Sequence, residues 1–197
     1  MKSKKRSHKT QPIDWATAMD LLKRLQGDEM HRERLFFGIG FYTGLLVSDY
    51  SQLKWCDLVF SDGTVKKRIT FGDATGKHQI INLNEKLQMI IGDSYNGQSL
   101  DKYIFTSKRH PFLNAPLTVA GCNYLIDKVL KRYGIKAANY SSHTLRKTFG
   151  RRIWEVQGKT DEALFCLAQI FHHPNIATTR QYLGIKDETI MNLYLSI

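Results

Sequence analysis

Hydrophobic residues recur at the spacing of α-helices in the first quarter of the chain. From Asp14 to Leu25 the apolar positions fall on one face, the pattern of an amphipathic helix that packs on a core. A longer and more apolar helix is expected to end at Gly44, and Ser48 is a candidate N-cap for a short helix after it. The helices predicted in this part of the chain are therefore 14–25, 29–43 and 49–54.

The pattern then changes to that of β-structure. The segments 64–71 and 78–83 are rich in β-branched residues, and the connection between them, Gly72–Lys77, is rich in turn formers, which predicts a β-hairpin. The remaining pattern is helical, and the predicted helices are 84–93, 117–133, 142–156, 161–171, 176–182 and 186–195. The sequence therefore predicts an α+β fold that is mainly α-helical, with one small antiparallel β-sheet.

The length of 197 residues suits one domain with a sizeable core. The longest mostly apolar run, Leu35–Val47, is too short to span a bilayer, and the basic, polar start of the chain does not resemble a signal peptide. The three cysteines lack the paired spacing of a disulfide framework or a zinc site, which suits a reducing compartment. A cytoplasmic protein without membrane contact is expected.

The charge balance is strongly basic, with 29 Lys and Arg against 18 Asp and Glu and a formal net charge of +11. Five of these basic residues lie within residues 1–10, which we interpret as a flexible arm or the remnant of a linker. The excess is also uneven in the rest of the chain, because residues 101–140 are distinctly basic. A one-sided positive surface would attract a polyanion such as nucleic acid, although solvated surface with a basic tail has the same composition.

A histidine and an arginine occur three residues apart at the start of a predicted helix. Ser141 or Ser142 is the candidate N-cap, which puts His143 and Arg146 on one face of the first turns. The two side chains together could contact one phosphate, the arginine through its bidentate fork and the histidine as a donor or proton shuttle. Alone, such a pair is more often a histidine bonded to a carbonyl and an arginine in a surface ion pair.

A second histidine and a tyrosine follow nearer the C-terminus. Pro174 disfavours helical geometry at the residue before it, so a helix is expected to end at His172 or His173. Asn175 is then a candidate N-cap for a short helix that includes Tyr182, nine residues after His173.

The ordered set His143, Arg146, His173 and Tyr182 resembles the tyrosine recombinase (phage integrase) family. The resemblance covers the chain after its basic head, and includes the hairpin and the segment Thr43-Gly44-Leu45. It implies that residues 11–197 are the catalytic domain and residues 1–10 the end of a linker. The N-terminal core-binding domain that family members usually carry is expected to be absent.

The resemblance implies site-specific DNA recombination or integration, as in mobile genetic elements. A tyrosine hydroxyl attacks a DNA phosphodiester and forms a 3′-phosphotyrosyl link, and a 5′-hydroxyl later reseals the strand. The bond energy is kept in the covalent link, so neither ATP nor a metal is needed and no cofactor is expected. By the same resemblance Tyr182 is the nucleophile, Arg146 binds the phosphate, and His143 and His173 are hydrogen-bond or proton-transfer partners.

Two positions depart from the family pattern. The family usually has a catalytic arginine directly after Thr-Gly-Leu, where this chain has Leu46. The catalytic lysine of the hairpin would align with Ala74, and Lys77, three residues later, could substitute for it or be a solvated turn residue. Other candidates for the missing positive charge are Lys54, Lys147, Arg151 and Arg180. A smaller departure is His172, where the family usually has glycine; this makes it ambiguous which imidazole faces the phosphate, and the nine-residue spacing to Tyr182 favours His173.

These features leave two main hypotheses open: an active recombinase in which another basic residue replaces the arginine, and a DNA-binding relative with impaired cleavage that acts as a binding or regulatory module. A basic helical protein unrelated to DNA is a third. The family resemblance also implies double-stranded DNA as the partner and a homotetramer on DNA, with a monomer when free. Residues 187–197 are a candidate helix for exchange between protomers or for packing on their own domain.

Overall fold

A computed structural model of the chain describes residues 10–72, 78–107, 113–136 and 139–185. The polypeptide divides into two compact units, Met1–Phe149 and Gly150–Ile197. Within the described ranges, no helix combines the length and the apolar character that crossing a bilayer requires. The predicted arm at residues 1–9, the turn at 73–77 and the predicted helix at 186–195 lie outside the described residues.

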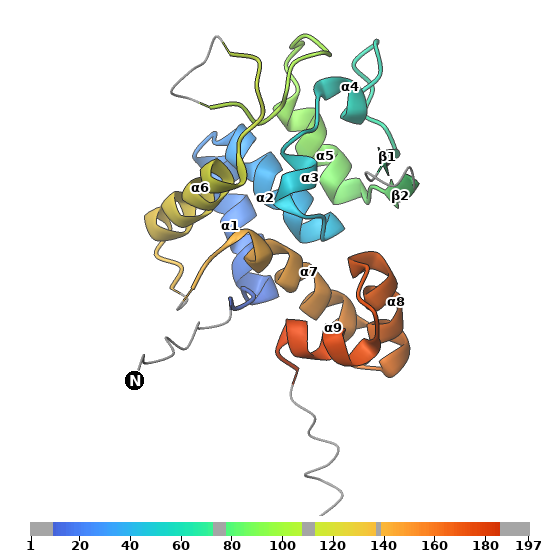
Figure 1. Ribbon diagram of the computed structural model, residues 1–197. Coiled ribbons are helices and arrows are strands. Elements are labelled where there is room, and N and C mark those ends of the chain that lie inside the picture. Colours follow the sequence, from blue (N-terminus) through green and yellow to red (C-terminus); the bar gives the residue numbers. More distant parts are fainter. Residues whose placement is uncertain (1–9, 73–77, 108–112, 137–138, 186–197) are drawn as a thin grey trace, which may run out of the picture. The chain divides into compact units, whose positions relative to one another are not determined.

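The described part of the chain is mainly helical with one two-stranded antiparallel sheet, as predicted (Figure 1). In chain order the elements are α1 (Trp15–Gly27), α2 (His31–Thr43), α3 (Val47–Tyr50), α4 (Trp55–Leu58), β1 (Arg68–Gly72), β2 (His78–Asn82), α5 (Glu85–Ser94), α6 (Val119–Arg132), α7 (Ser142–Val156), α8 (Asp161–Phe171) and α9 (Ile176–Leu183).

Polar residues cap most of the longer helices, because a side-chain oxygen can accept a hydrogen bond from an amide that has no partner inside the helix. The oxygens and amides joined in this way are Asp14 to Thr17 at 3.1 Å, Asn84 to Leu87 at 2.9 Å, Thr118 to Gly121 at 3.1 Å, Thr160 to Ala163 at 3.2 Å and Asn175 to Thr178 at 2.8 Å. The cap predicted at Asn175 is confirmed.

The short elements between α2 and the sheet differ from the prediction. The helix predicted over 49–54 is wrong in position, since α3 begins at Val47 and ends at Tyr50. A further four-residue helix, α4, was not predicted, and Asp57 stabilises its start by accepting a hydrogen bond from the Lys54 amide at 2.8 Å. Helices this short bury too few residues to show a helical period, so the sequence pattern carries little signal for them.

The hairpin is confirmed, with Arg68 opposite Asn82 and Gly72 opposite His78. The first strand is shorter than predicted, because residues 64–67 lie outside it. Val65 instead forms an isolated antiparallel bridge with Val59, directly after α4. Only the last part of the β-branched segment, from Arg68, therefore belongs to the hairpin.

The core of the first unit is built around α2, which is buried along almost its whole length. The helix packs against α1 and α5 (Figure 1). The ring of Phe36 meets Tyr50 and Phe105 edge-on, with centroid distances of 5.1 and 5.2 Å. The buried Arg34 is paired through Nη1 with Asp93 Oδ2 at 2.6 Å, which compensates its charge.

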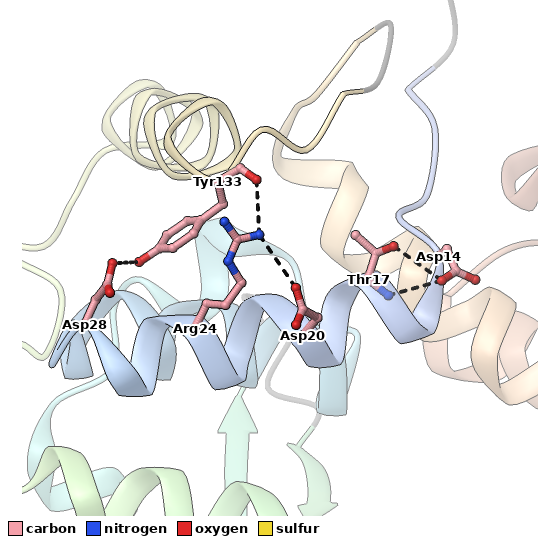
Figure 2. Close-up of polar contacts among 6 residues, drawn as sticks. All are labelled: Asp14, Thr17, Asp20, Arg24, Asp28 and Tyr133. Atoms are coloured by element: carbon pink, nitrogen blue, oxygen red, sulfur yellow. Dashed lines mark hydrogen bonds and ion pairs between the residues drawn. The ribbon is translucent and has the colours of Figure 1, made fainter.

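The end of α1 is joined to the end of α6 by polar contacts (Figure 2). The Tyr133 hydroxyl donates to Asp28 Oδ2 at 2.6 Å, and the Arg24 guanidinium donates to the Tyr133 carbonyl at 3.3 Å while lying 4.7 Å from the centre of its ring. The hydroxyl of Tyr133, followed by the neighbouring Arg132, lowers the pKa of Asp28. These contacts join the end of α1 to the end of α6.

Glycines in and after α2 allow α7 to come close. A Cβ at position 40 would lie 2.8 Å from Leu145 Cβ, and a Cβ at position 44 would overlap the ring of Phe149. Gly44 also has a positive φ of 65°, and its carbonyl accepts a hydrogen bond from Arg146 Nη1 at 2.5 Å. The side chains of Leu145 and Arg146 are thereby fixed between α2 and the turn that follows it.

Substitution of Gly40 by alanine is expected to destabilise the first unit by about 1–3 kcal/mol, because the new methyl group overlaps Leu145 in a packed core. Gly92, in α5, is a matched control, since its nearest contact would be Val65 at 3.8 Å and alanine favours a helix. Gly92→Ala should therefore leave the free energy of unfolding unchanged or raise it slightly. Urea unfolding of both variants measures the difference, and equal stabilities would contradict this account of the packing.

Candidate active site

The His143 and Arg146 pair is held at the N-terminal end of α7 in the first unit. Ser141, rather than Ser142, is the cap: its hydroxyl accepts from the His143 amide at 3.2 Å, and its amide donates to Thr144 Oγ1 at 3.1 Å. The Arg146 side chain is 6% exposed, and its bond to the Gly44 carbonyl sets the direction of the guanidinium. The start of a helix also favours anionic groups through its exposed amides and its dipole.

The surroundings of His143 favour the neutral imidazole. Its pKa is lowered from the usual 6.5, chiefly by partial burial and then by the positive charges of Lys147 and Arg146. A histidine with a lowered pKa is neutral at pH 7 and can accept a proton or a hydrogen bond. The chain thus places a neutral imidazole and a guanidinium on neighbouring turns of one helix.

The segment before α1 is tied to the same part of α7. Lys147 Nζ donates to the Thr10 carbonyl at 2.8 Å, the hydroxyls of Thr10 and Ser141 are 3.0 Å apart, and the Ile13 amide donates to Thr148 Oγ1 at 2.9 Å. Lys147 is 7% exposed. Lys147, the residue next to Arg146, therefore binds the segment that leads into α1.

Leu46 lies between the turn that contacts Arg146 and the first residue of α3. It is 36% exposed, and as the residue preceding α3 it makes no side-chain capping bond. Its carbonyl accepts hydrogen bonds from the amides of Asp49 and Tyr50 at 2.9 and 3.2 Å. Position 46 is thus a partly exposed position on the same short connection as Gly44, where a longer polar side chain would not have to be buried.

In the second unit, α8 ends in a left-handed turn at His172. The φ of His172 is 53°, and the amides of His172 and His173 donate to the carbonyls of Gln169 and Ala168 at 3.2 and 2.9 Å, which is a Schellman motif. The helix therefore ends at Phe171 because of this turn. The sequence pattern predicts instead that Pro174, which lies three residues later, ends the helix. Glycine is the residue best suited to this conformation, which gives a physical reason for the glycine usual in the family.

His173 and Tyr182 lie together in the second unit. Their rings are 5.1 Å apart at an interplanar angle of 72°, and the Phe171 ring contacts both, at 5.4 and 5.6 Å. His172 is exposed, and no contact is described between it and Tyr182. Of the two neighbouring histidines, His173 is the one beside the tyrosine.

Thr179 is a site residue that sequence reasoning missed. Its hydroxyl oxygen lies 2.9 Å from His173 Nδ1, and its side chain is fully buried. The available signal was the spacing: a threonine six residues after a histidine, in the second turn of a helix capped by Asn175. The contact depends on the left-handed turn at His172, which the sequence pattern did not reveal.

The other candidate cations are all engaged within their own units. Lys54 lies 5.3 Å from the centre of the Tyr103 ring, Arg151 lies 5.3 Å from the Trp154 ring and 3.9 Å from Glu155, and Arg180 is paired with Asp161 at 2.6 Å. Lys77 and Ala74 lie outside the described residues. Across the described residues, no group of three or more His, Cys, Asp or Glu side chains could hold a metal ion.

The predicted quartet thus occurs as two pairs. His143 and Arg146 lie in the first unit, and His173 and Tyr182 lie in the second. Within each pair the local structure explains the orientation: a capped helix start and a glycine turn for the first, and a left-handed turn with ring packing for the second.

Solved structures with the same fold include recombinases. The crystal structure of XerA recombinase matches 96% of this chain and 65% of that protein, with a TM-score of 0.66 and 22% sequence identity. A structure of XerH site-specific recombinase bound to its palindromic difH substrate matches 95% of this chain and 53% of that protein, with a TM-score of 0.64 and 16% identity. The chain therefore has the fold of tyrosine recombinase catalytic domains.

The sequence comparisons identify the family. The sequence model of the Phage integrase family matches residues 7–189, and the chain belongs to this family. Tyrosine recombinase XerH of Campylobacter jejuni is 25% identical over 162 residues, which are 81% of this chain and 43% of the relative. The probable integrase/recombinase YoeC of Bacillus subtilis is 24% identical over 190 residues, 95% of this chain and 96% of the relative.

The chain spans about half the length of several curated relatives that it matches, 43% of XerH and 53% of tyrosine recombinase XerC from Staphylococcus haemolyticus. Its match to YoeC, in contrast, covers nearly the whole of both chains.

The pKa of His143 is expected to lie below 6.5 and to rise when a neighbouring positive charge is removed. Lys147→Gln should raise it more than Arg146→Gln, because Lys147 is the larger electrostatic influence. Histidine NMR titration of the free protein measures both shifts. Lys131→Gln is the control, since that lysine is paired with Asp127 on α6. An unchanged His143 titration in Lys147→Gln would contradict the electrostatic account.

Proposed function

We propose that this chain cleaves and rejoins DNA at specific sites through a covalent tyrosine intermediate. The observation that carries the proposal is the packing of the Tyr182 ring against His173, within a chain that belongs to the Phage integrase family. The chemistry needs a nucleophilic hydroxyl, a proton-transfer partner beside it and cations for the phosphate. Each of these groups occurs in one of the two pairs described above.

In the proposed reaction the Tyr182 hydroxyl oxygen attacks the phosphorus while the bond from phosphorus to the 5′-oxygen breaks. The tyrosine loses its proton to a neighbouring acceptor, and the leaving 5′-oxygen gains one, so a 3′-phosphotyrosyl link and a 5′-hydroxyl result. Attack of a 5′-hydroxyl on this link releases the tyrosine and restores a phosphodiester. The number of phosphate ester bonds is unchanged, so no external energy source is needed.

We assign the roles as follows. Arg146 binds the scissile phosphate through its guanidinium and stabilises the charge that develops in the transition state. His143, neutral at pH 7 because its pKa is lowered, is a proton or hydrogen-bond acceptor, and His173 is the hydrogen-bond partner next to Tyr182. Lys77, which directly precedes β2, is the proposed lysine of the hairpin. Convergence of the two pairs on one phosphate is part of the proposal.

Double-stranded DNA is the proposed partner. The net charge of +11 supports it, as do the relatives solved with DNA: XerH with its difH substrate and the Tn1549 transposon integrase with circular intermediate DNA. We further propose that the chain is monomeric when free and forms a tetramer on DNA. Residues 11–197 are the proposed catalytic domain.

Leu46 supports an alternative, in which the chain binds DNA but cleaves it inefficiently and acts as a binding or regulatory module. Leucine cannot bind phosphate, and loss of one of two phosphate-binding arginines would slow cleavage by ~10²–10³-fold, by analogy with the loss of an oxyanion-hole donor. The two functions differ in one observable, the covalent adduct between protein and DNA.

Tyr182→Phe is expected to abolish the covalent adduct, because phenylalanine has no hydroxyl to attack the phosphate. The measurement uses a pool of nicked duplexes with random sequence around the nick, in which the leaving strand diffuses away and traps the adduct for detection in denaturing gels. Tyr95→Phe, which removes a hydroxyl bonded to the Gln98 carbonyl, is the matched control and should retain the adduct. DNA binding without any adduct from the wild-type chain would reject the cleavage function and support the binding module.

Leu46→Arg is expected to accelerate adduct formation by about 10²-fold, since it supplies a second guanidinium on the connection that contacts Arg146. The position is partly exposed, so the longer side chain should not cost the fold much stability. Leu46→Gln, which adds polar length without charge, is the control. Equal rates for wild type, Arg and Gln variants would show that position 46 does not act on the phosphate.

A further inference from the structure

The Thr179 hydroxyl has one hydrogen-bond partner among the described residues, the imidazole of His173. The residue lies in α9, its side chain is fully buried, and its Oγ1 is 2.9 Å from His173 Nδ1. Among the described residues this nitrogen is the only hydrogen-bond partner of the hydroxyl. Burial also keeps water away, so the hydroxyl hydrogen has no alternative acceptor in the described structure.

Two other buried threonines show the usual arrangement for comparison. Thr43 and Thr148 each donate their hydroxyl hydrogen to the carbonyl four residues earlier, at 2.7 and 2.9 Å. Thr179 lies in the second turn of α9, where its amide donates to the Asn175 carbonyl at 3.4 Å, but among the described residues its hydroxyl makes no bond to that carbonyl. The hydroxyl of Thr179 is therefore directed to the imidazole and not to the helix backbone.

The direction of this bond decides which imidazole nitrogen carries the proton. If Nδ1 were protonated it would donate to Oγ1, and the hydroxyl hydrogen would be left buried without an acceptor, which is unfavourable. If the hydroxyl donates, Nδ1 is the acceptor, both groups are satisfied, and the proton of the neutral ring must be on Nε2.

We propose that Thr179 is a positioning residue that donates to His173 Nδ1 and keeps the neutral imidazole in its Nε2–H form, so that His173 presents an N–H donor to a phosphate oxygen of DNA. The phosphate part rests on the proposed function, whereas the tautomer is a property of the free protein. The two histidines then have different tasks: His173 donates a hydrogen bond, and the neutral His143 accepts one.

The ring packing adds a geometric reason. The imidazole packs edge-on against the Phe171 ring and the Tyr182 ring, which also contact each other, and its Nδ1 edge faces Thr179. Nε2 is on the opposite edge of a five-membered ring, so fixing Nδ1 also fixes the direction of the Nε2–H bond. The same contact therefore sets both the tautomer and the orientation of the donor.

The tautomer can be measured directly by long-range ¹H–¹⁵N correlation of the histidine rings in the free, ¹⁵N-labelled full chain above pH 7. The His173 signals are assigned by their loss in His173→Gln. The wild-type ring should show a protonated Nε2 and an unprotonated Nδ1. Thr179→Ser should keep this pattern, whereas Thr179→Val, which has the same shape without the hydroxyl, should show a mixture of tautomers. A wild-type ring protonated at Nδ1 would overturn the proposal without any variant.

Adduct formation with the nicked duplexes tests the consequence for DNA. Thr179→Val should slow the adduct by roughly 10-fold, as loss of a partner behind a functional histidine does at metal sites, and Thr179→Ser should restore most of the rate. Thr178→Val is the matched control, because its hydroxyl pairs with Asn175 and not with the imidazole. A changed tautomer with an unchanged rate would overturn the donor role. If the wild-type chain forms no adduct, the cleavage function fails on its own, and the nitrogen spectrum still decides whether Thr179 sets the tautomer.

Discussion

The close approach of α2 and α7 is the constraint on which the first part of the site depends. Two glycines make it possible, since a side chain at position 40 or 44 would overlap Leu145 or Phe149. The same approach lets the Gly44 carbonyl accept a hydrogen bond from Arg146. Core packing and the candidate site are therefore linked here, because the buried Leu145 and the half-buried Phe149 alternate along α7 with His143 and Arg146.

In the second unit, a left-handed turn rather than a pair of glycines orients the candidate site residues. A non-glycine residue in the left-handed region, His172, turns the chain sharply so that the next residue lies against α9. Such a conformation is unfavourable for a residue with a side chain, and it persists because the surrounding hydrogen bonds determine it. Two backbone bonds to α8, the Thr179 contact and the packing of two aromatic rings all act on the short stretch 171–173.

Sequence reasoning recovered the elements with strong local signals. The longer helices, the cap at Asn175 and the hairpin of β-branched residues were predicted because their determinants lie within a few residues of one another. Helix α4 was missed and α3 misplaced, since four residues show no period. The order and spacing of His143, Arg146, His173 and Tyr182 were visible in the sequence. The contacts of Arg146 with Gly44 and of His173 with Thr179 were not, because each requires a turn conformation or a tertiary approach that periodicity does not encode.

Under the proposed function, leucine rather than arginine at position 46 would affect DNA binding and DNA cleavage unequally. Binding sums many contacts between basic residues and phosphates, so one missing cation changes it little. Cleavage depends on the charge at a single phosphate, where the transition state carries more negative charge than the bound DNA. Lys54, Lys147, Arg151 and Arg180 are each committed to contacts of their own, so recruiting any of them would require breaking a contact that the free protein makes. Under the proposed function, an active recombinase and a DNA-binding relative would therefore differ only in degree, in how much positive charge reaches one phosphate.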